Sequence, residues 1–239
     1  MKFAYPLLTL TCILFGPAAS AEPFYTPERD QYAVEKPATQ DTEDLPKVLL
    51  IGDSIMGGYF KQTKQLLKGE AEVFRQPGNA GETRNGLKKL DQWLGDIEWD
   101  VIHFNWGLHD LCYRHPDAKV YGKRDKINGT LSVPLDEYAE NLEKLVRRLK
   151  QSGATLIFAT TTRIPAGEAG RFVGDDVKYN NVARKIITRH GVAVNDLYAL
   201  SSGFDPEMYV APGDVHHTGK ANAALAAQVA EAIQEHGLK

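Results

Sequence analysis

The feature that most constrains the fold is an alternation of short apolar runs with amphipathic helical segments. The runs are short, rich in β-branched or aromatic residues and bounded by Gly, Asp or Asn, which is typical of strands buried on both faces. They cover residues 48–51, 101–104, 155–160 and 192–194, with residues 71–74 as a weaker fifth candidate. Strand, helix, strand in repetition predicts an α/β fold, a three-layer α/β/α sandwich around a central parallel sheet.

Two helices are predicted from different signals in the sequence. Residues 135–151 place their apolar side chains on one stripe, and Gly153 follows as a helix stop. The segment after Thr218 is rich in alanine, so we expect it to lie close against the sheet. Thr218 is the predicted N-cap of this last helix.

The N-terminal residues predict export. Residues 1–21 have a positive start, a short apolar centre and small residues at the end, which is the pattern of a cleavable signal peptide. Residues 22–46, rich in Pro, Thr and acidic side chains, read as an extended arm. We therefore expect one ordered domain, residues 47–239, in a secreted or periplasmic protein.

Charge and cysteine content exclude several alternatives. The net charge is −3 and no basic face is visible, so nucleic acid is not an expected partner. No segment of the mature chain approaches the roughly 20 apolar residues of a membrane-spanning helix, so no stable membrane insertion is expected. Cys12 leaves with the signal peptide, which leaves Cys112 without a disulfide partner. The oligomeric state is not indicated.

Polar segments follow three of the predicted strands, where ligands bind in parallel sheets. Gly52-Asp53-Ser54 follows the first strand, a loop over residues 77–86 the second, and Gly107-Leu108-His109-Asp110 the third. Ser54 leads into a helix, whose free amides favour an anion, so it is a candidate nucleophile. A plain turn or N-cap serine fits the same pattern.

A second polar cluster, with Asp214, His216 and His217, lies just before the last helix. An imidazole oriented by a carboxylate is a suitable general base. A capping loop or a surface histidine pair is the alternative. His109, Asp110 and the histidine pair are also acceptable metal ligands, although no HExxH spacing is present.

Together these blocks resemble the SGNH (GDSL) hydrolase superfamily, from about Lys47 to the C-terminus. The resemblance implies a flavodoxin-like three-layer fold and a serine esterase, acetylesterase or lipase that needs no cofactor. Ser54 would be the nucleophile and would donate its own N–H to the oxyanion. Gly81 matches the glycine of the second block, whose amide is another donor.

His109 departs from the family pattern, which has asparagine at this position as an oxyanion donor. A subgroup of secreted bacterial members looks similar, including its Gly-Leu-His-Asp, so we interpret His109 as a substitute donor. In the last block, an Asp-x-x-His spacing selects Asp214 and His217. The spacing to the Thr or Asn cap selects His216 instead, and we prefer His216 as the base with Asp214 orienting it.

The substrate is inferred from two long connections, residues 111–133 and 163–175. Their polar and aromatic side chains suit a sugar or a small polar ester: Tyr113, Arg114, Tyr121 and Arg171. No Gly-x-Ser-x-Gly occurs, which excludes an ordinary α/β-hydrolase. The expected activity is hydrolysis of O-acetyl esters on carbohydrates. A lipase-like hydrolase of small or lipid esters and an inactive glycan-binding relative are the alternatives.

Overall fold

The computed structural model describes Met1 and residues 45–238 of the chain. Its centre is a five-stranded sheet in the order β2-β1-β3-β6-β7, in which every neighbouring pair is parallel. The strands are β1 (Lys47–Ile51), β2 (Glu72–Arg75), β3 (Val101–Phe104), β6 (Thr155–Ala159) and β7 (Ala193–Asn195). The predicted three-layer α/β/α sandwich is confirmed.

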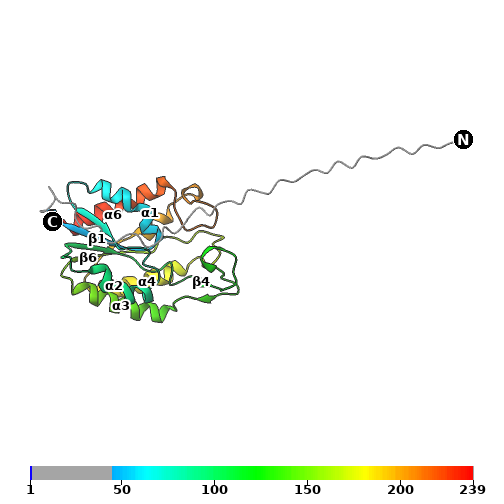
Figure 1. Ribbon diagram of the computed structural model, residues 1–239, viewed down its shortest axis with the longest axis horizontal. Helices are drawn as coiled ribbons and strands as arrows, with labels where there is room; N and C mark the ends of the chain where they lie inside the picture. The colour runs from blue at the N-terminus through cyan, green and yellow to red at the C-terminus, as the bar shows by residue number, and fades with distance from the viewer. Residues whose placement is uncertain (2–44, 239) are drawn as a thin grey trace.

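Helices cover both faces of this sheet (Figure 1). On one face α1 (Ser54–Leu66) packs against α6 (Gly219–His236). On the other face lie α2 (Thr83–Leu94), α3 (Leu135–Lys150) and α4 (Asp175–Arg189). A short α5 (Leu197–Ser202) follows β7.

The alanine-rich α6 contacts strands β6 and β7 of the sheet, as its composition predicts, and also packs closely on α1. A Cβ added at Gly58 of α1 would lie 2.8 Å from the Asn222 side chain of α6, so the two helices approach too closely for a larger residue there. Thr218 is the N-cap of α6, as expected. Its hydroxyl donates to the Met208 carbonyl rather than bonding a helix amide, at an Oγ1–O distance of 3.3 Å.

Strand boundaries differ from the expected ones at their polar ends. The second strand covers residues 72–75 and the last residues 193–195, each one position later than predicted. Arg75 pairs with Leu50, and Asn195 pairs with Ala159. Neither residue is apolar, so a search for apolar runs ends each strand too early.

The connection over residues 111–133 has structure of its own. It contains an antiparallel pair, β4 (Tyr113–Arg114) and β5 (Thr130–Leu131), and a 3-10 turn η1 (Tyr121–Lys123) between them. Figure 1 shows β4 at one end of the molecule, away from the middle of the five-stranded sheet. A further 3-10 turn, η2 (Pro206–Met208), precedes the last loop.

Apart from Met1, the expected signal peptide over residues 1–21 lies outside the described residues, as does the arm over residues 22–46 except for its last two positions. Within the described part of the chain, no helix is long and apolar enough to span a bilayer. Cys112 is a free, buried cysteine.

Candidate active site

Ser54 sits where the first strand turns into the first helix. Asp53 is the N-cap of α1, and its carboxylate accepts the Ile55 N–H at 2.8 Å. Ser54 is the first residue of α1, so its backbone N–H has no partner within the helix. The hydroxyl therefore stands on a fixed turn at the positive end of a helix.

Gln76 holds this turn in place, a role that the sequence analysis missed. Its side chain accepts from the Gly52 N–H at 3.2 Å and donates to the Gly52 carbonyl at 2.6 Å. A Cβ at Gly52 would lie 2.6 Å from the Met56 Cβ, so only glycine fits there. The available signal was a polar residue directly after a buried strand, at the carboxyl edge of the sheet.

Ser54, His216 and Asp214 form a connected series. The Ser54 Oγ and His216 Nε2 atoms are 2.8 Å apart, and His216 Nδ1 lies 2.6 Å from Asp214 Oδ1. The hydrogen bonds from His216 lower the pKa of Asp214 to about 2, so this carboxyl is ionised and accepts from Nδ1–H. Nε2 is then free of a proton and can receive one from the serine.

His217 makes a different set of contacts. It is buried, with ring centroids 5.5 Å from Phe204 and 5.2 Å from Tyr209. Neither ring nitrogen has a hydrogen-bond partner among the described residues, and burial lowers the pKa of His217 to about 4. His216 is thus the member of the pair that reaches Ser54.

The loop that carries the two histidines is tied down on both sides. The Val210 N–H donates to the His216 carbonyl at 3.0 Å, and the Thr218 N–H donates to the Met208 carbonyl at 2.9 Å. Gly213 has a φ of 75°, and a Cβ there would lie 2.7 Å from the Gly167 carbonyl oxygen. The terminal loop therefore packs directly on the connection over residues 163–175.

The Gly81 amide is engaged within its own loop. Gly81 has a φ of 62°, and its N–H donates to Asn79 Oδ1 at 2.8 Å. Asn85 of α2 donates to the Ala80 carbonyl at 2.9 Å and holds the loop from the helix side. Donation from Gly81 to an oxyanion requires this hydrogen to be shared with Asn79 or released from it.

His109 and Asp110 are neighbours with different surroundings. Arg114 Nη2 lies 3.4 Å from His109 Nδ1, and burial lowers the pKa of His109 to about 4, so the ring is neutral near pH 7. Asp110 accepts from Thr83 through both the backbone N–H, at 2.9 Å, and the hydroxyl, at 2.5 Å. Burial raises the pKa of Asp110 to about 7.

The four potential metal ligands, His109, Asp110, His216 and His217, have different surroundings. Within residues 45–238, no group of three or more His, Cys, Asp or Glu side chains is arranged to hold a metal ion.

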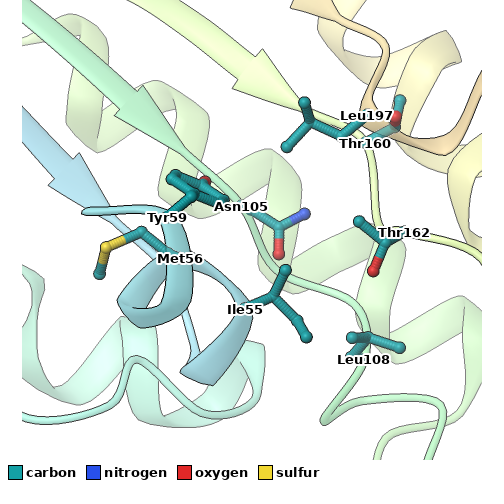
Figure 2. Close-up of a pocket in the computed structure, with 8 residues that line it drawn as sticks. All are labelled: Ile55, Met56, Tyr59, Asn105, Leu108, Thr160, Thr162 and Leu197. Carbon is teal, nitrogen blue, oxygen red and sulfur yellow. The ribbon is translucent and has the colours of Figure 1, made fainter. Parts of the chain in front are cut away.

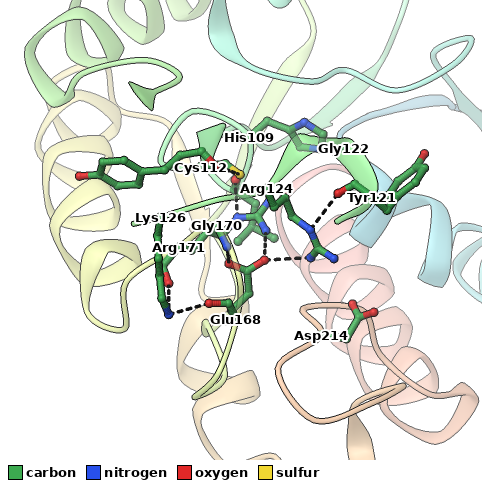
Figure 3. Close-up of polar contacts among 12 residues, drawn as sticks. His109, Cys112, Tyr121, Gly122, Arg124, Lys126, Glu168, Gly170, Arg171 and Asp214 are labelled. Atoms are coloured by element: carbon green, nitrogen blue, oxygen red, sulfur yellow. Dashed lines mark hydrogen bonds and ion pairs between the residues drawn. The ribbon is translucent and has the colours of Figure 1, made fainter. Parts of the chain in front are cut away.

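A buried charge network joins the two long connections (Figure 3). Glu168 is fully buried and accepts from Arg124 at 2.8 Å and from Arg171 at 2.9 Å. Arg171 also donates to the Leu108 carbonyl at 2.7 Å and is only 4% exposed. The expectation that Arg171 lines an open substrate pocket is therefore wrong, because its guanidinium is used to hold the loops together.

The two aromatic candidates, Tyr113 and Tyr121, are less buried than Arg171. Tyr113 packs edge-on against Phe172 with ring centroids 5.3 Å apart. Tyr121 is 57% exposed.

A small cavity lies on the sheet side of α1 (Figure 2). Its volume is about 10 Å³, and Ser54 is not part of its lining. The lining consists of Ile55, Met56, Tyr59, Asn105, Leu108, Thr160, Thr162 and Leu197. A space of this size holds about one water molecule, so it does not accommodate an ester.

The fold and this series of contacts fit one class of protein, the serine hydrolases that act on ester bonds, and a family comparison assigns the chain to it. The model of the GDSL-like Lipase/Acylhydrolase family matches residues 50–224, and the chain belongs to this family. The suspected superfamily is therefore confirmed. No curated protein matches the chain.

Solved structures show the same fold at low sequence identity. The acetyl xylan esterase AlAXEase is 17% identical with a TM-score of 0.63, over 78% of this chain and 99% of that one. A lipase/acylhydrolase from Enterococcus faecalis is 18% identical with a TM-score of 0.65, over 80% of this chain and 96% of that one.

Proposed function

We propose that the chain is an exported esterase that removes O-acyl groups, most simply acetyl, from carbohydrates through an acyl-enzyme on Ser54. The observation that carries this proposal is the series Ser54–His216–Asp214, with 2.8 Å and 2.6 Å between successive polar atoms. In a chain of the GDSL-like family, that series supplies a nucleophile, a base and an orienting carboxylate.

The first half of the reaction forms the acyl-enzyme. His216 Nε2 takes the Ser54 proton while Oγ bonds to the carbonyl carbon of the ester, whose oxygen becomes an oxyanion. The Ser54 N–H, the Gly81 N–H and His109 are the proposed donors to that oxyanion. When the intermediate collapses, the bond to the alcohol oxygen breaks and His216 returns its proton to the leaving alcohol.

The second half frees the acid. His216 takes a proton from a water molecule, whose oxygen attacks the acyl carbon, and the bond to Ser54 Oγ breaks with return of the proton to the serine. Asp214 remains a carboxylate throughout, in keeping with its pKa of about 2. These steps need only the side chains named and water.

A carbohydrate ester is favoured by the aromatic and polar side chains on the connection over residues 111–133, among them Tyr121, which is 57% exposed. A structural neighbour of this fold is an acetyl xylan esterase, which agrees with the same substrate class. Removal of residues 1–21 as a signal peptide, with residues 22–46 as an arm before the domain, would place the enzyme where such glycans occur.

A lipid or other small ester is the second candidate. It is favoured by exposed apolar side chains on the two long connections, with Ile127 78% exposed and Val173 61% exposed. Initial rates on p-nitrophenyl esters of increasing acyl length, beside acetylated xylan, separate the two. Preference for acetyl supports the first candidate, and a rate that rises with chain length supports the second.

Labelling with a fluorophosphonate probe tests the mechanism. We expect an adduct on Ser54 that is absent in Ser54→Ala and still present in Ser202→Ala, a control serine of α5 whose hydroxyl bonds only the Tyr198 carbonyl among the described residues. An intact, folded protein that takes up no probe would favour the alternative, a glycan-binding protein without turnover.

A further inference from the structure

We propose that Arg114 is a positioning residue, which fixes the neutral His109 ring as an Nε2–H donor for the developing oxyanion. This inference rests on the proposed function, because it deepens the role given there to His109. It concerns a residue outside the series Ser54–His216–Asp214.

The tautomer follows from the chemistry of the contact between the two side chains. A guanidinium has only N–H donors and no acceptor. Arg114 Nη2 lies 3.4 Å from His109 Nδ1, so Nδ1 must present its lone pair. The pKa of His109 is lowered to about 4 by burial, which leaves one ring proton near neutral pH. That proton is therefore on Nε2.

The position of Arg114 is built into its loop. Its Nη1 donates to the Gly122 carbonyl. Gly122 has a φ of 68°, and a Cβ there would lie 3.0 Å from Nη1. A Cβ at Gly129 would lie 2.9 Å from the Arg114 backbone nitrogen. Larger residues at either glycine would displace the arginine.

The pairing between β4 and β5 supports the same placement. Arg114 pairs with Thr130 across the two strands and forms an isolated bridge with Arg124. Figure 3 shows His109 and Gly122 next to one another, as their shared contact with Arg114 requires. The loop thus delivers a guanidinium to one particular nitrogen of His109.

The contact with Arg114 explains how His109 can serve where the family pattern has asparagine. An asparagine amide at this position is a donor whatever its surroundings. A neutral imidazole donates from only one of its two nitrogens, and in the other tautomer Nε2 would turn a lone pair toward the oxyanion. Replacing asparagine by histidine therefore creates a need for tautomer selection, which Arg114 supplies.

The charged groups around His109 oppose one another. Asp53 and Glu82 raise its pKa, whereas Arg114 and Arg171 lower it. The arginines and burial together outweigh the two carboxylates. The ring therefore remains neutral, as donation from Nε2 with a free lone pair on Nδ1 requires.

The tautomer can be read directly by long-range ¹H–¹⁵N NMR of the wild-type protein labelled at histidine, near neutral pH. His109→Asn identifies its signals. We expect Nδ1 without a proton and Nε2 protonated, and in Arg114→Met we expect a mixture. An Nδ1–H signal for His109 in the wild type would overturn the proposal, and this reading does not require any Arg114 variant to fold.

A double-mutant cycle in kcat tests the consequence. Loss of a hydrogen bond to a charged group predicts a fall in kcat of about tenfold to a hundredfold in Arg114→Met, with KM changed by less than about threefold. In a His109→Asn background, where the donor needs no selection, adding Arg114→Met should change kcat by less than about twofold.

Controls separate positioning from other roles. Arg147→Met, at an exposed arginine of α3, should leave kcat unchanged. A loss in Arg114→Met that persists in the His109→Asn background would mean that Arg114 acts on the substrate or the loop itself, which contradicts the proposal. Failure of the proposed function would appear separately, as absence of the Ser54 adduct in the wild type.

Discussion

Asp214 Oδ1 accepts from two donors of His216, the backbone N–H at 2.9 Å and the ring Nδ1 at 2.6 Å. The carboxylate is only two positions before the histidine, so a tight turn brings it to both donors. Because Nδ1 of His216 faces Asp214, the other ring nitrogen, Nε2, faces Ser54.

Asp214→Asn should lower kcat by about 10³- to 10⁴-fold, because an amide can donate to Nδ1 and stabilise the wrong tautomer. Turnover of p-nitrophenyl acetate gives the measurement. Asp117→Asn, at a carboxyl whose side chain is 89% exposed, is the control and should keep full activity. Near-normal turnover by a folded Asp214→Asn would show that another group orients His216.

The histidine pair should separate cleanly by function. We expect His216→Ala to lose turnover with the fold intact, because Ser54 then has no base. His217→Ala should keep turnover but lower the free energy of unfolding by about 1–3 kcal/mol, through the cavity left between Phe204 and Tyr209. Urea unfolding and kcat are measured on the same samples. Loss of turnover in His217→Ala with turnover kept in His216→Ala would identify His217 as the base.

Asp110 predicts a pH dependence of stability. Its pKa is about 7 in the folded protein against the ordinary 3.8, so the folded state binds the extra proton between these values. The free energy of unfolding contributed by this group therefore falls as pH rises from about 4 to about 7.

Asp110→Asn should remove that dependence. Urea unfolding at pH values inside and above this window should show the wild type losing stability relative to the variant as pH rises, on the order of 4 kcal/mol in total. A difference that stays constant with pH would contradict the raised pKa. The subtraction also cancels His109 and His217, whose lowered pKa values give the opposite slope.

Gln76→Ala should loosen the turn that presents Ser54, because the N–H and the carbonyl of Gly52 both lose a partner. We expect the free energy of unfolding to fall by about 2 kcal/mol and kcat to fall with it. Gln92→Ala, on the exposed side of α2, is the matched control. Unchanged stability and kcat in Gln76→Ala would show that the conformation of this turn does not depend on Gln76.

The sheet could be read from the sequence because its strands are buried on both faces and form continuous apolar runs. Several strand bounds differ by one residue from the expected ones, among them the ends of β2 and β7, where the polar residues Arg75 and Asn195 complete the ladder, and the end of β6 at Ala159 rather than Thr160. The preference for His216 over His217 rests on the resemblance, whose pattern places the histidine two positions before a cap such as Thr218, and the structure places His216 Nε2 2.8 Å from Ser54 Oγ.

Contacts that depend on tertiary placement could not be read in this way. Gln76 carries no motif, and its role appears only when β2 lies beside β1. Arg171 looks like a surface cation in sequence, yet it is buried because Glu168 from the same loop neutralises it. The engagement of the Gly81 amide by Asn79 likewise depends on a loop conformation that spacing alone does not define.

The acyl-enzyme is best tested by acid quenching during turnover of p-nitrophenyl acetate, followed by peptide mass spectrometry. The account predicts an acetyl group on the peptide that contains Ser54, which accumulates before steady state and is absent in Ser54→Ala. Turnover without any acetylated intermediate, or acetyl found on another residue while Ser54→Ala remains active, would contradict it.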